Sequence, residues 1–228
     1  MADALADLSS MDWILKFLDV ILHLNLYLDQ LAGAYGPWIY ALLFLIIFSE
    51  TGLVVTPFLP GDALLFTVGT LTAENGPLNL LLILVLLTVA GILGHTTNYW
   101  IGQTLGQRLF RNPQSRIFNR KHLDQTHAFY ERHGAKTIML SRFLPLIRTF
   151  APFVAGMSSM GYQKFFVYNV VGAFVWVFSV VLLGHFFGNL PYVQKNYSVV
   201  ILAIVVISMI PPGLEILRGW LGRSKAKI

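Results

Sequence analysis

Four charged residues stand in otherwise apolar stretches of the chain: Glu50, Asp62, Arg142 and Arg148. The arginines suit phosphate, because a planar guanidinium donates paired hydrogen bonds to it. The acids suit proton uptake, because the protonation of a shielded carboxylate responds to whether a neighbouring cation is occupied. A charge at the centre of a membrane-spanning helix costs about 2.5–3.5 kcal/mol. We therefore expect acids and arginines to lie together.

Such a cluster has two interpretations. It could be a buried ion pair that only holds two segments together, or a site where phosphate occupies the arginines and releases the acids to take up protons. Buried ion pairs are often no more stabilising than apolar replacements, which favours the second interpretation. His95 and His185 are candidate proton relays, although a histidine hydrogen-bonded to a neighbour at a helix interface is the favoured interpretation of each. Without cysteine or a His/Glu metal spacing, we expect neither metal nor cofactor.

The composition places this cluster in a membrane. The chain has 228 residues, of which 56% are hydrophobic and 12% charged, whereas soluble domains are about 25% charged. Apolar runs at Leu78–Leu93, Phe165–Leu183 and Val199–Ile210 are long enough, with their flanks, to span a bilayer.

Proline interrupts the two stretches that carry the charges. We predict breaks near 38–73 at Pro57, Pro60 and Gly61, and near 135–157 at Pro145 and Pro152. Proline has no N–H, and backbone groups freed in this way must be buried in protein or line a wet cavity. Both stretches are therefore predicted to be re-entrant helical hairpins.

Basic residues suggest the orientation. No Lys or Arg occurs between Lys16 and Arg108, and clusters follow at 108–121 and from Arg218 onward. Such clusters mark cytoplasmic loops, so we interpret them as orientation signals and not as a nucleic-acid surface. The C-terminus is then cytoplasmic, and the two hairpins open to opposite faces, as in inverted-repeat transporters.

A weak internal repeat agrees with this topology. A shift of 92 residues aligns Glu50 with Arg142 and superposes four identical pairs: Ser49 and Ser141, Phe58 and Phe150, Pro60 and Pro152, and Ala63 and Ala155. The sequence Leu-Gly-His also recurs, ending at His95 and at His185.

Together these features predict an all-α integral membrane protein with two opposed re-entrant hairpins and about three spanning helices. Residues 1–35 form an acidic N-terminal part with an amphipathic in-plane helix from Asp12 to about Leu31. Residues 36–188 form the transmembrane domain, with a polar helix at Phe118–His133. Residues 189–228 form a last spanning helix and a basic cytoplasmic tail. Gly102 and Gly106 permit close helix approach, either within the chain or in a homo-oligomer.

The segments Phe48–Asp62 (FSETGLVVTPFLPGD) and Arg142–Gly156 (RFLPLIRTFAPFVAG) resemble the DedA family, also called the SNARE-associated or VTT-domain family, and its bacterial members in particular. The resemblance covers Gly36 to Gly188. It implies an inner-membrane lipid transporter, since members are linked to recycling of undecaprenyl phosphate and eukaryotic relatives scramble phospholipids. The family's functional acids and arginines map onto the four charged residues. His95 departs from the pattern, since many members carry an acid there.

The leading hypothesis is a flippase, not an enzyme, that moves undecaprenyl phosphate or a related lipid phosphate across the bacterial inner membrane with proton linkage. Arg142 and Arg148 would bind the phosphate, and Glu50 and Asp62 would carry the protons. An uncoupled phospholipid scramblase is the first alternative. A membrane phosphatase or lipid transferase, with His95 or His185 in its chemistry, and an assembly scaffold are the others.

Overall fold

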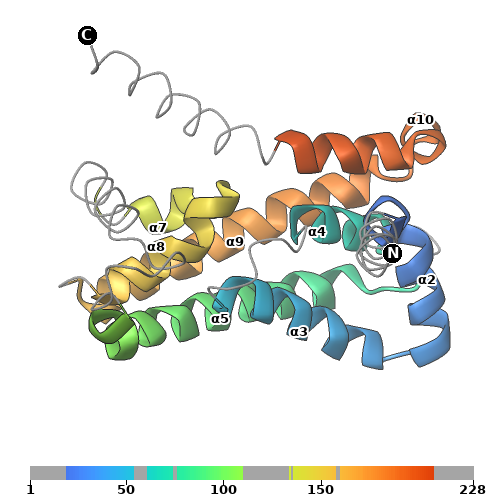
Figure 1. Ribbon diagram of the computed structural model, residues 1–228. Helices are drawn as coiled ribbons and strands as arrows, with labels where there is room; N and C mark the ends of the chain where they lie inside the picture. The colour runs from blue at the N-terminus through green and yellow to red at the C-terminus, as the bar shows by residue number, and fades with distance from the viewer. Residues whose placement is uncertain are drawn as a thin grey trace, which may run out of the picture. The chain divides into compact units, whose positions relative to one another are not determined.

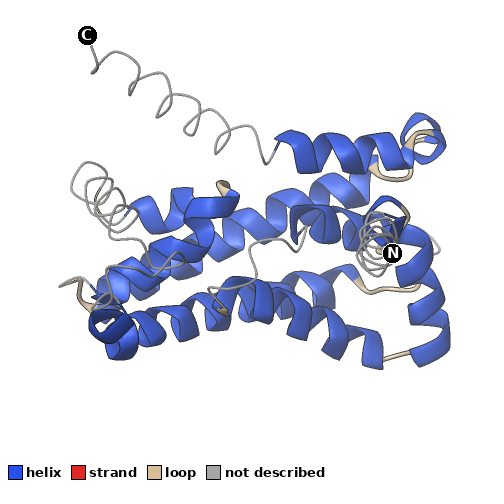
Figure 2. Cartoon of the chain, viewed as in Figure 1, coloured by secondary structure: helices blue, strands red, loops and turns tan. Residues whose placement is uncertain are grey.

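The computed structural model describes residues 19–53, 61–73, 76–109, 134, 136–157 and 160–207, and every regular element among them is an α-helix (Figure 2). The predicted all-α class is thus confirmed for these residues. The helices labelled in Figure 1 are α2 (Leu24–Tyr35), α3 (Trp38–Gly52), α4 (Gly61–Thr70), α5 (Leu80–Leu109), α7 (Lys136–Ser141), α8 (Pro145–Met157), α9 (Tyr162–Phe187) and α10 (Pro191–Lys195). A further apolar helix covers Tyr197–Ile207.

The chain divides into two compact units. Unit 1 comprises Met1–Ile39, Pro60–Leu80 and Val180–Val206, and unit 2 comprises Tyr40–Leu59, Leu81–Ser179 and Ile207–Ile228. Each unit is described by itself.

Among the described residues, two helices are long and apolar enough to cross a membrane: Leu80–Thr104 within α5, and α9. They match the spans predicted from the apolar runs. α3 and Tyr197–Ile207 are apolar but shorter. The last predicted span is described only as far as Ile207, and the polar helix predicted at Phe118–His133 lies outside the described residues.

In both proline-containing stretches, one helix ends and a second helix begins a few residues later. α3 ends at Gly52 and α4 begins at Gly61, while α7 ends at Ser141 and α8 begins at Pro145. Proline is well tolerated at the first helical position, because its missing N–H would have no partner there. Pro57 and Pro60 lie outside the described residues.

The predicted break at Pro152 is wrong, because Pro152 lies inside α8. Only one helical hydrogen bond is lost at such a proline. The next three side chains, Phe153, Val154 and Ala155, are all buried, and their packing holds this turn in the helix.

The order of elements repeats along the chain. A helix, an interruption, a second helix and then a long helix occur as α3, α4 and α5, and again as α7, α8 and α9. This order supports an internal repeat. The 92-residue shift does not align the helices of the two halves throughout. It places Pro60, next to the start of α4, opposite Pro152, in the middle of α8. The reason is that α4 begins nine residues after the end of α3, whereas α8 begins four residues after the end of α7.

In unit 1, close backbone contact joins α4 to the end of α9. A Cβ atom added to Gly184 would lie 2.0 Å from the carbonyl oxygen of Phe66. The core of this unit includes Ala63, Phe66 and Ile201. The Tyr197 hydroxyl donates to Thr67 Oγ1 at 2.7 Å, which ties the last described helix to α4.

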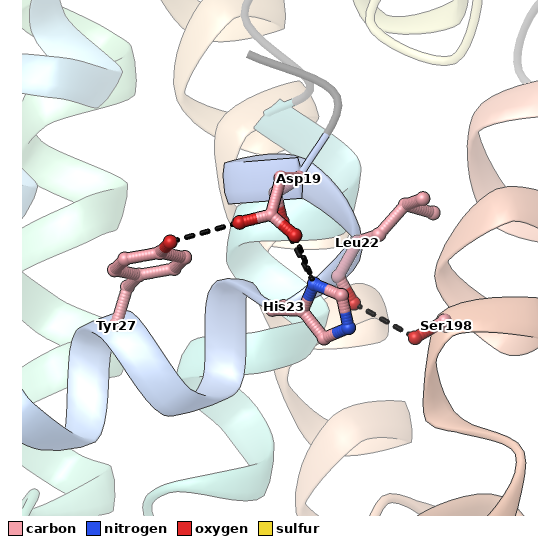
Figure 3. A network of polar contacts seen from close by, with 5 residues as sticks. All are labelled: Asp19, Leu22, His23, Tyr27 and Ser198. Carbon is pink, nitrogen blue, oxygen red and sulfur yellow. Dashed lines mark hydrogen bonds and ion pairs between the residues drawn. The ribbon is translucent and has the colours of Figure 1, made fainter. Parts of the chain in front are cut away.

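The N-terminal helix differs from its prediction. A turn at His23 interrupts it, and α2 then continues to Tyr35, where Gly36 with φ of 52° ends it. Figure 3 shows the cause of the local order: Asp19 accepts a hydrogen bond from Tyr27 at 2.9 Å and lies 2.9 Å from His23 Nδ1. Asp12 lies outside the described residues.

Tyr27 is outside the predicted spanning segments, and its hydrogen bond to Asp19, with the negative charge of that carboxylate, raises the pKa of the Tyr27 phenol. Figure 3 also shows Ser198 donating to the Leu22 carbonyl at 3.2 Å. The start of the described chain is thereby fixed to the helix at Tyr197–Ile207.

In unit 2, α5 and α8 touch through glycine. A Cβ atom on Gly102 would lie 2.0 Å from the Phe153 carbonyl oxygen, and one on Gly156 would lie 2.0 Å from that of Tyr99. The predicted close approach at Gly102 is therefore an internal contact. The core beside it includes Tyr99, Phe153 and Phe165.

Candidate functional site

Unit 2 contains a cluster of buried polar side chains, none more than 2% exposed: Glu50 in α3, His95 and Asn98 in α5, Arg142 just after α7, Arg148 in α8 and Asn169 in α9. We call these six residues the buried polar cluster. It combines both broken segments with both long helices. Four of its members are predicted site residues: Glu50, His95, Arg142 and Arg148.

Glu50 and Arg148 form an ion pair, although they are 98 residues apart in the sequence. Arg148 NH2 donates to Glu50 Oε1, and both side chains are almost completely buried. An acid of the first broken segment thus pairs with an arginine of the second, as expected from the cost of isolated charges.

Arg142 is held by neutral groups. Its NH2 donates to the Gly91 carbonyl at 3.1 Å and to Asn169 Oδ1 at 2.6 Å. The Asn169 amide nitrogen donates in turn to the Ile92 carbonyl at 3.0 Å, which fixes its orientation. Arg142 Nε and NH1 are buried and have no hydrogen-bond partner in the part of the chain that the structure describes. Since a guanidinium carries five N–H donors, Arg142 retains donors for a ligand.

Trp176 holds both guanidinium groups near its ring. The ring centroid lies 5.7 Å from Arg142 Cζ and 5.2 Å from Arg148 Cζ. The negative face of an indole attracts cations, and more strongly when they are desolvated. This contact offsets part of the repulsion that Arg142 experiences from Arg148.

Two glycines leave the space that the Arg142 side chain occupies. A Cβ atom on Gly91 would lie 3.3 Å from Arg142 NH1. One on Gly172 would lie 3.0 Å from Met139 Cα and 3.3 Å from Arg142 Cδ. The side chain therefore lies in a slot between α5 and α9 that exists because both helices lack a side chain there.

Asn98 connects the two broken segments. Its Nδ2 donates to the Thr149 carbonyl at 2.8 Å and, more weakly, to the Thr51 carbonyl at 3.4 Å. Thr51 follows Glu50 and Thr149 follows Arg148, so this one amide positions the backbone beside both partners of the ion pair. His95, one turn earlier in α5, is fully buried.

Two predicted site residues lie in unit 1. Asp62 is in the first turn of α4, and its sharing of a site with the arginines stays a prediction. His185 Nδ1 lies 3.0 Å from Thr72 Oγ1, whose own proton goes to the Gly69 carbonyl at 2.7 Å. His185 thus has the helix-interface hydrogen bond that was one of its two interpretations. The described residues contain no group of three or more acidic or histidine side chains placed to hold a metal ion.

The sequence reasoning did not single out Asn98, Asn169 or Trp176. A signal existed for the two asparagines, because polar side chains in apolar spanning helices usually face the bundle interior. Trp176 gave no such signal, because an aromatic residue in an apolar helix can face either the lipid or the protein interior.

Comparison with known proteins agrees with this architecture. The VTT domain model matches residues 59–186. The chain is 53% identical to the protein DedA of Escherichia coli K12 over 209 residues, which is 91% of this chain and 95% of DedA. It is 38% identical to an uncharacterized membrane protein of Mycobacterium tuberculosis over 195 residues, 85% of this chain and 86% of that protein. It is 35% identical to the inner membrane protein YqjA of E. coli over 158 residues, 69% of this chain and 71% of YqjA.

No solved structure matches the chain. The domain match and these identities define a VTT-domain membrane protein. The chain belongs to the DedA family, as its two motifs indicated.

Proposed function

We propose that this protein is a proton-linked transporter that moves a lipid phosphate, with undecaprenyl phosphate as the expected substrate, across the bacterial inner membrane. Arg142 and Arg148 bind the phosphate, and Glu50 and Asp62 carry protons. The observation that carries the proposal is the charge of the buried polar cluster: among the described residues of unit 2, the buried charged side chains are two arginines and one glutamate. The excess positive charge suits an anion.

The ion pair supplies a way to couple phosphate and protons. Phosphate reaching Arg148 competes with Glu50 for the same guanidinium. A carboxylate that loses its cation in a buried site is costly as an anion and takes up a proton. When the phosphate leaves, the ion pair forms again and the proton is released. Binding of the lipid and movement of the proton are then two parts of one exchange.

The location in the inner membrane is supported by the similarity to YqjA, an inner membrane protein of E. coli. A cytoplasmic C-terminus is supported by the basic clusters after Arg108 and Arg218. The Glu50–Arg148 pair also suits a second candidate role, in which it only holds the two broken segments together.

The test is lipid-phosphate flipping in proteoliposomes with an imposed pH gradient. Arg148→Lys keeps a charge beside Glu50 but loses the planar fork, and we expect flipping to fall about tenfold or more, since hydrogen bonds to charged groups contribute roughly 1.5–3 kcal/mol. Glu50→Gln should still bind the lipid but lose its response to the gradient. Lys164→Ala removes an exposed cation and is the matched control.

A purely structural pair predicts a different result. Both variants would unfold at lower temperature while the folded fraction flips lipid at the wild-type rate with the wild-type response to pH. A wild-type protein that flips phospholipid equally well with and without the gradient would instead identify an uncoupled scramblase.

A further inference from the structure

His95 is a buried side chain without the hydrogen bonds that a buried histidine normally makes to its protein neighbours. It is 0% exposed, and neither ring nitrogen has a hydrogen-bond partner in the described part of the chain. An unsatisfied buried polar group costs about 1–3 kcal/mol, and nearly all buried polar groups in native proteins have partners. His185 shows the ordinary arrangement, because its ring pairs with Thr72. The missing partner of His95 therefore points to a ligand.

Helix geometry places His95 on the face of α5 that meets Arg142 and the backbone beside Arg148. Gly91, His95 and Asn98 lie four and three residues apart, so they share one face of α5. At one end of this face Gly91 accepts from Arg142, and at the other Asn98 donates to the Thr149 carbonyl, next to Arg148. The positive charges of both arginines act on His95. A ligand that touches both guanidinium groups would therefore pass the imidazole.

Two other roles fit the surroundings less well. A proton relay needs a hydrogen-bonded neighbour on each side of the ring, and the described residues supply none. A metal ion would need several ligands of suitable type, and no such group of side chains occurs among the described residues. The two guanidinium groups nearby would also repel a cation.

We infer that His95 is a specificity-determining residue that contacts the bound phosphate directly and selects a phosphate monoester over a diester. This inference rests on the proposed function and deepens it. A monoester has three non-bridging oxygens, which match Arg142, Arg148 and the N–H of a neutral imidazole. Alternatively, the same ring nitrogen in its unprotonated form can accept from the P–OH group of a singly protonated monoester. A diester offers two non-bridging oxygens and no P–OH, so it leaves His95 without its partner.

The test compares decyl phosphate with decyl methyl phosphate, which share one tail and differ in one ester group. Binding to the full chain in nanodiscs is measured by calorimetry, with empty nanodiscs subtracted. The wild type should bind the monoester about tenfold more tightly, as one or two hydrogen bonds to a charged ligand imply. His95→Phe should lose about this factor for the monoester and none for the diester. His95→Gln, which retains a donor and an acceptor, should recover part of the preference.

Thr97→Val is the matched control. Thr97 is two residues from His95, and its hydroxyl bonds the Leu93 carbonyl of its own helix at 2.9 Å. This variant should keep the wild-type affinity for both lipids. A His95→Phe protein that is folded and keeps the monoester preference would overturn the inference about His95 alone. Wild-type protein that binds neither lipid would instead count against the proposed function.

A second measurement covers the case in which His95→Phe does not fold. The chain has six histidines, and a variant with the other five replaced by glutamine reports His95 alone by nitrogen NMR. Decyl phosphate should shift a ring nitrogen of His95, and decyl methyl phosphate should shift it much less. Equal responses to the two lipids, or no response to either in a protein that binds the monoester, would contradict the inference.

Discussion

At the scale of single residues, the two arginines of the buried polar cluster have different surroundings. Arg148 has a carboxylate partner in Glu50, whereas Arg142 is held by a carbonyl, an amide oxygen and the ring of Trp176. A cation whose hydrogen-bond partners are neutral is not neutralised by a carboxylate, so its charge can attract an anion. Arg142 is therefore the residue at which we expect an incoming phosphate to bind first, with Arg148 following as Glu50 is displaced.

Asn169→Asp tests this difference. The change replaces the neutral acceptor 2.6 Å from Arg142 NH2 by a carboxylate of nearly the same shape. We expect an internal ion pair that neutralises Arg142 and lowers lipid-phosphate affinity about tenfold or more, because hydrogen bonds to charged groups contribute roughly 1.5–3 kcal/mol. Calorimetric titration of decyl phosphate measures the effect.

The control for this prediction is Asn169→Ala. It removes the contact but adds no charge, so its affinity should lie between those of the wild type and Asn169→Asp. If the aspartate variant binds decyl phosphate as tightly as the alanine variant, the charge of Arg142 does not attract the ligand.

The composition of the cluster was predictable only in part, and the reason is physical. A charge in an apolar stretch is conspicuous because it is expensive, so Glu50, Arg142 and Arg148 could be found from the sequence. The pairing of Glu50 with Arg148, and not with its repeat counterpart Arg142, depends on packing between segments 98 residues apart. Neutral residues such as Asn169 gave a weaker signal, because an amide costs less to bury than a charge.

At the scale of helices, the cluster is positioned by glycines that bring backbones together. Gly94 in α5 is one case, since a Cβ atom there would lie 3.0 Å from the Phe48 carbonyl oxygen of α3 and 1.9 Å from Thr51 Oγ1. Farther along, Gly102 brings the same helix against the backbone of α8 at Phe153. The ends of α3 and α8, which carry Glu50 and Arg148, are thereby held against one long helix.

Gly102→Ala should therefore destabilise unit 2. The new methyl group would lie 2.0 Å from the Phe153 carbonyl oxygen, and backbone cannot rotate away as a side chain can. We expect a loss of about 1–3 kcal/mol, the usual cost of overpacking. Reversible unfolding of the purified protein in mixed micelles with SDS, followed by circular dichroism, measures it.

Gly33→Ala is the matched control for this substitution. Gly33 lies inside α2, and a Cβ atom there meets nothing within 4 Å. Since alanine favours helix over glycine by up to about 1 kcal/mol, this variant should be as stable as the wild type or slightly more stable. Equal stability of the two alanine variants would show that α5 and α8 are not in such close contact.

Helix boundaries could be predicted from the sequence where a single feature, such as a long apolar run, determined them. Long apolar runs predicted α5 and α9 because apolar length alone defines a span. Proline predicted the start of α8 at Pro145 correctly but misled at Pro152, since a proline that starts a helix and a proline tolerated inside it beside buried neighbours look the same in the sequence. The turn at His23 was missed because neither glycine nor proline stands near it in the sequence.

At the scale of the whole molecule, aromatic residues mark the end of α5 as an interface region, and basic residues indicate which side of the membrane that end faces. Near its end, Tyr99 and Trp100 each lie with ring centroids 5.6 Å from that of Tyr162, at the start of α9. Exposed rings such as Trp100 and Tyr162 are typical of membrane interfaces. The basic cluster from Arg108 onward follows directly in the sequence. We therefore expect this aromatic group to lie at the cytoplasmic interface and the other end of α9 to face outward.

Cysteine labelling tests this orientation, and the chain is suited to it because it contains no cysteine. Tyr192, in α10 beyond the end of α9, is 78% exposed. Tyr192→Cys should react with a membrane-impermeant maleimide in intact spheroplasts, whereas Ser224→Cys, in the basic tail, should react only after permeabilisation. Val171→Cys is the control, because Val171 is 45% exposed in α9 and should face lipid, where a maleimide in water cannot reach its thiol. Labelling of Ser224→Cys before permeabilisation, with Tyr192→Cys protected, would reverse the orientation.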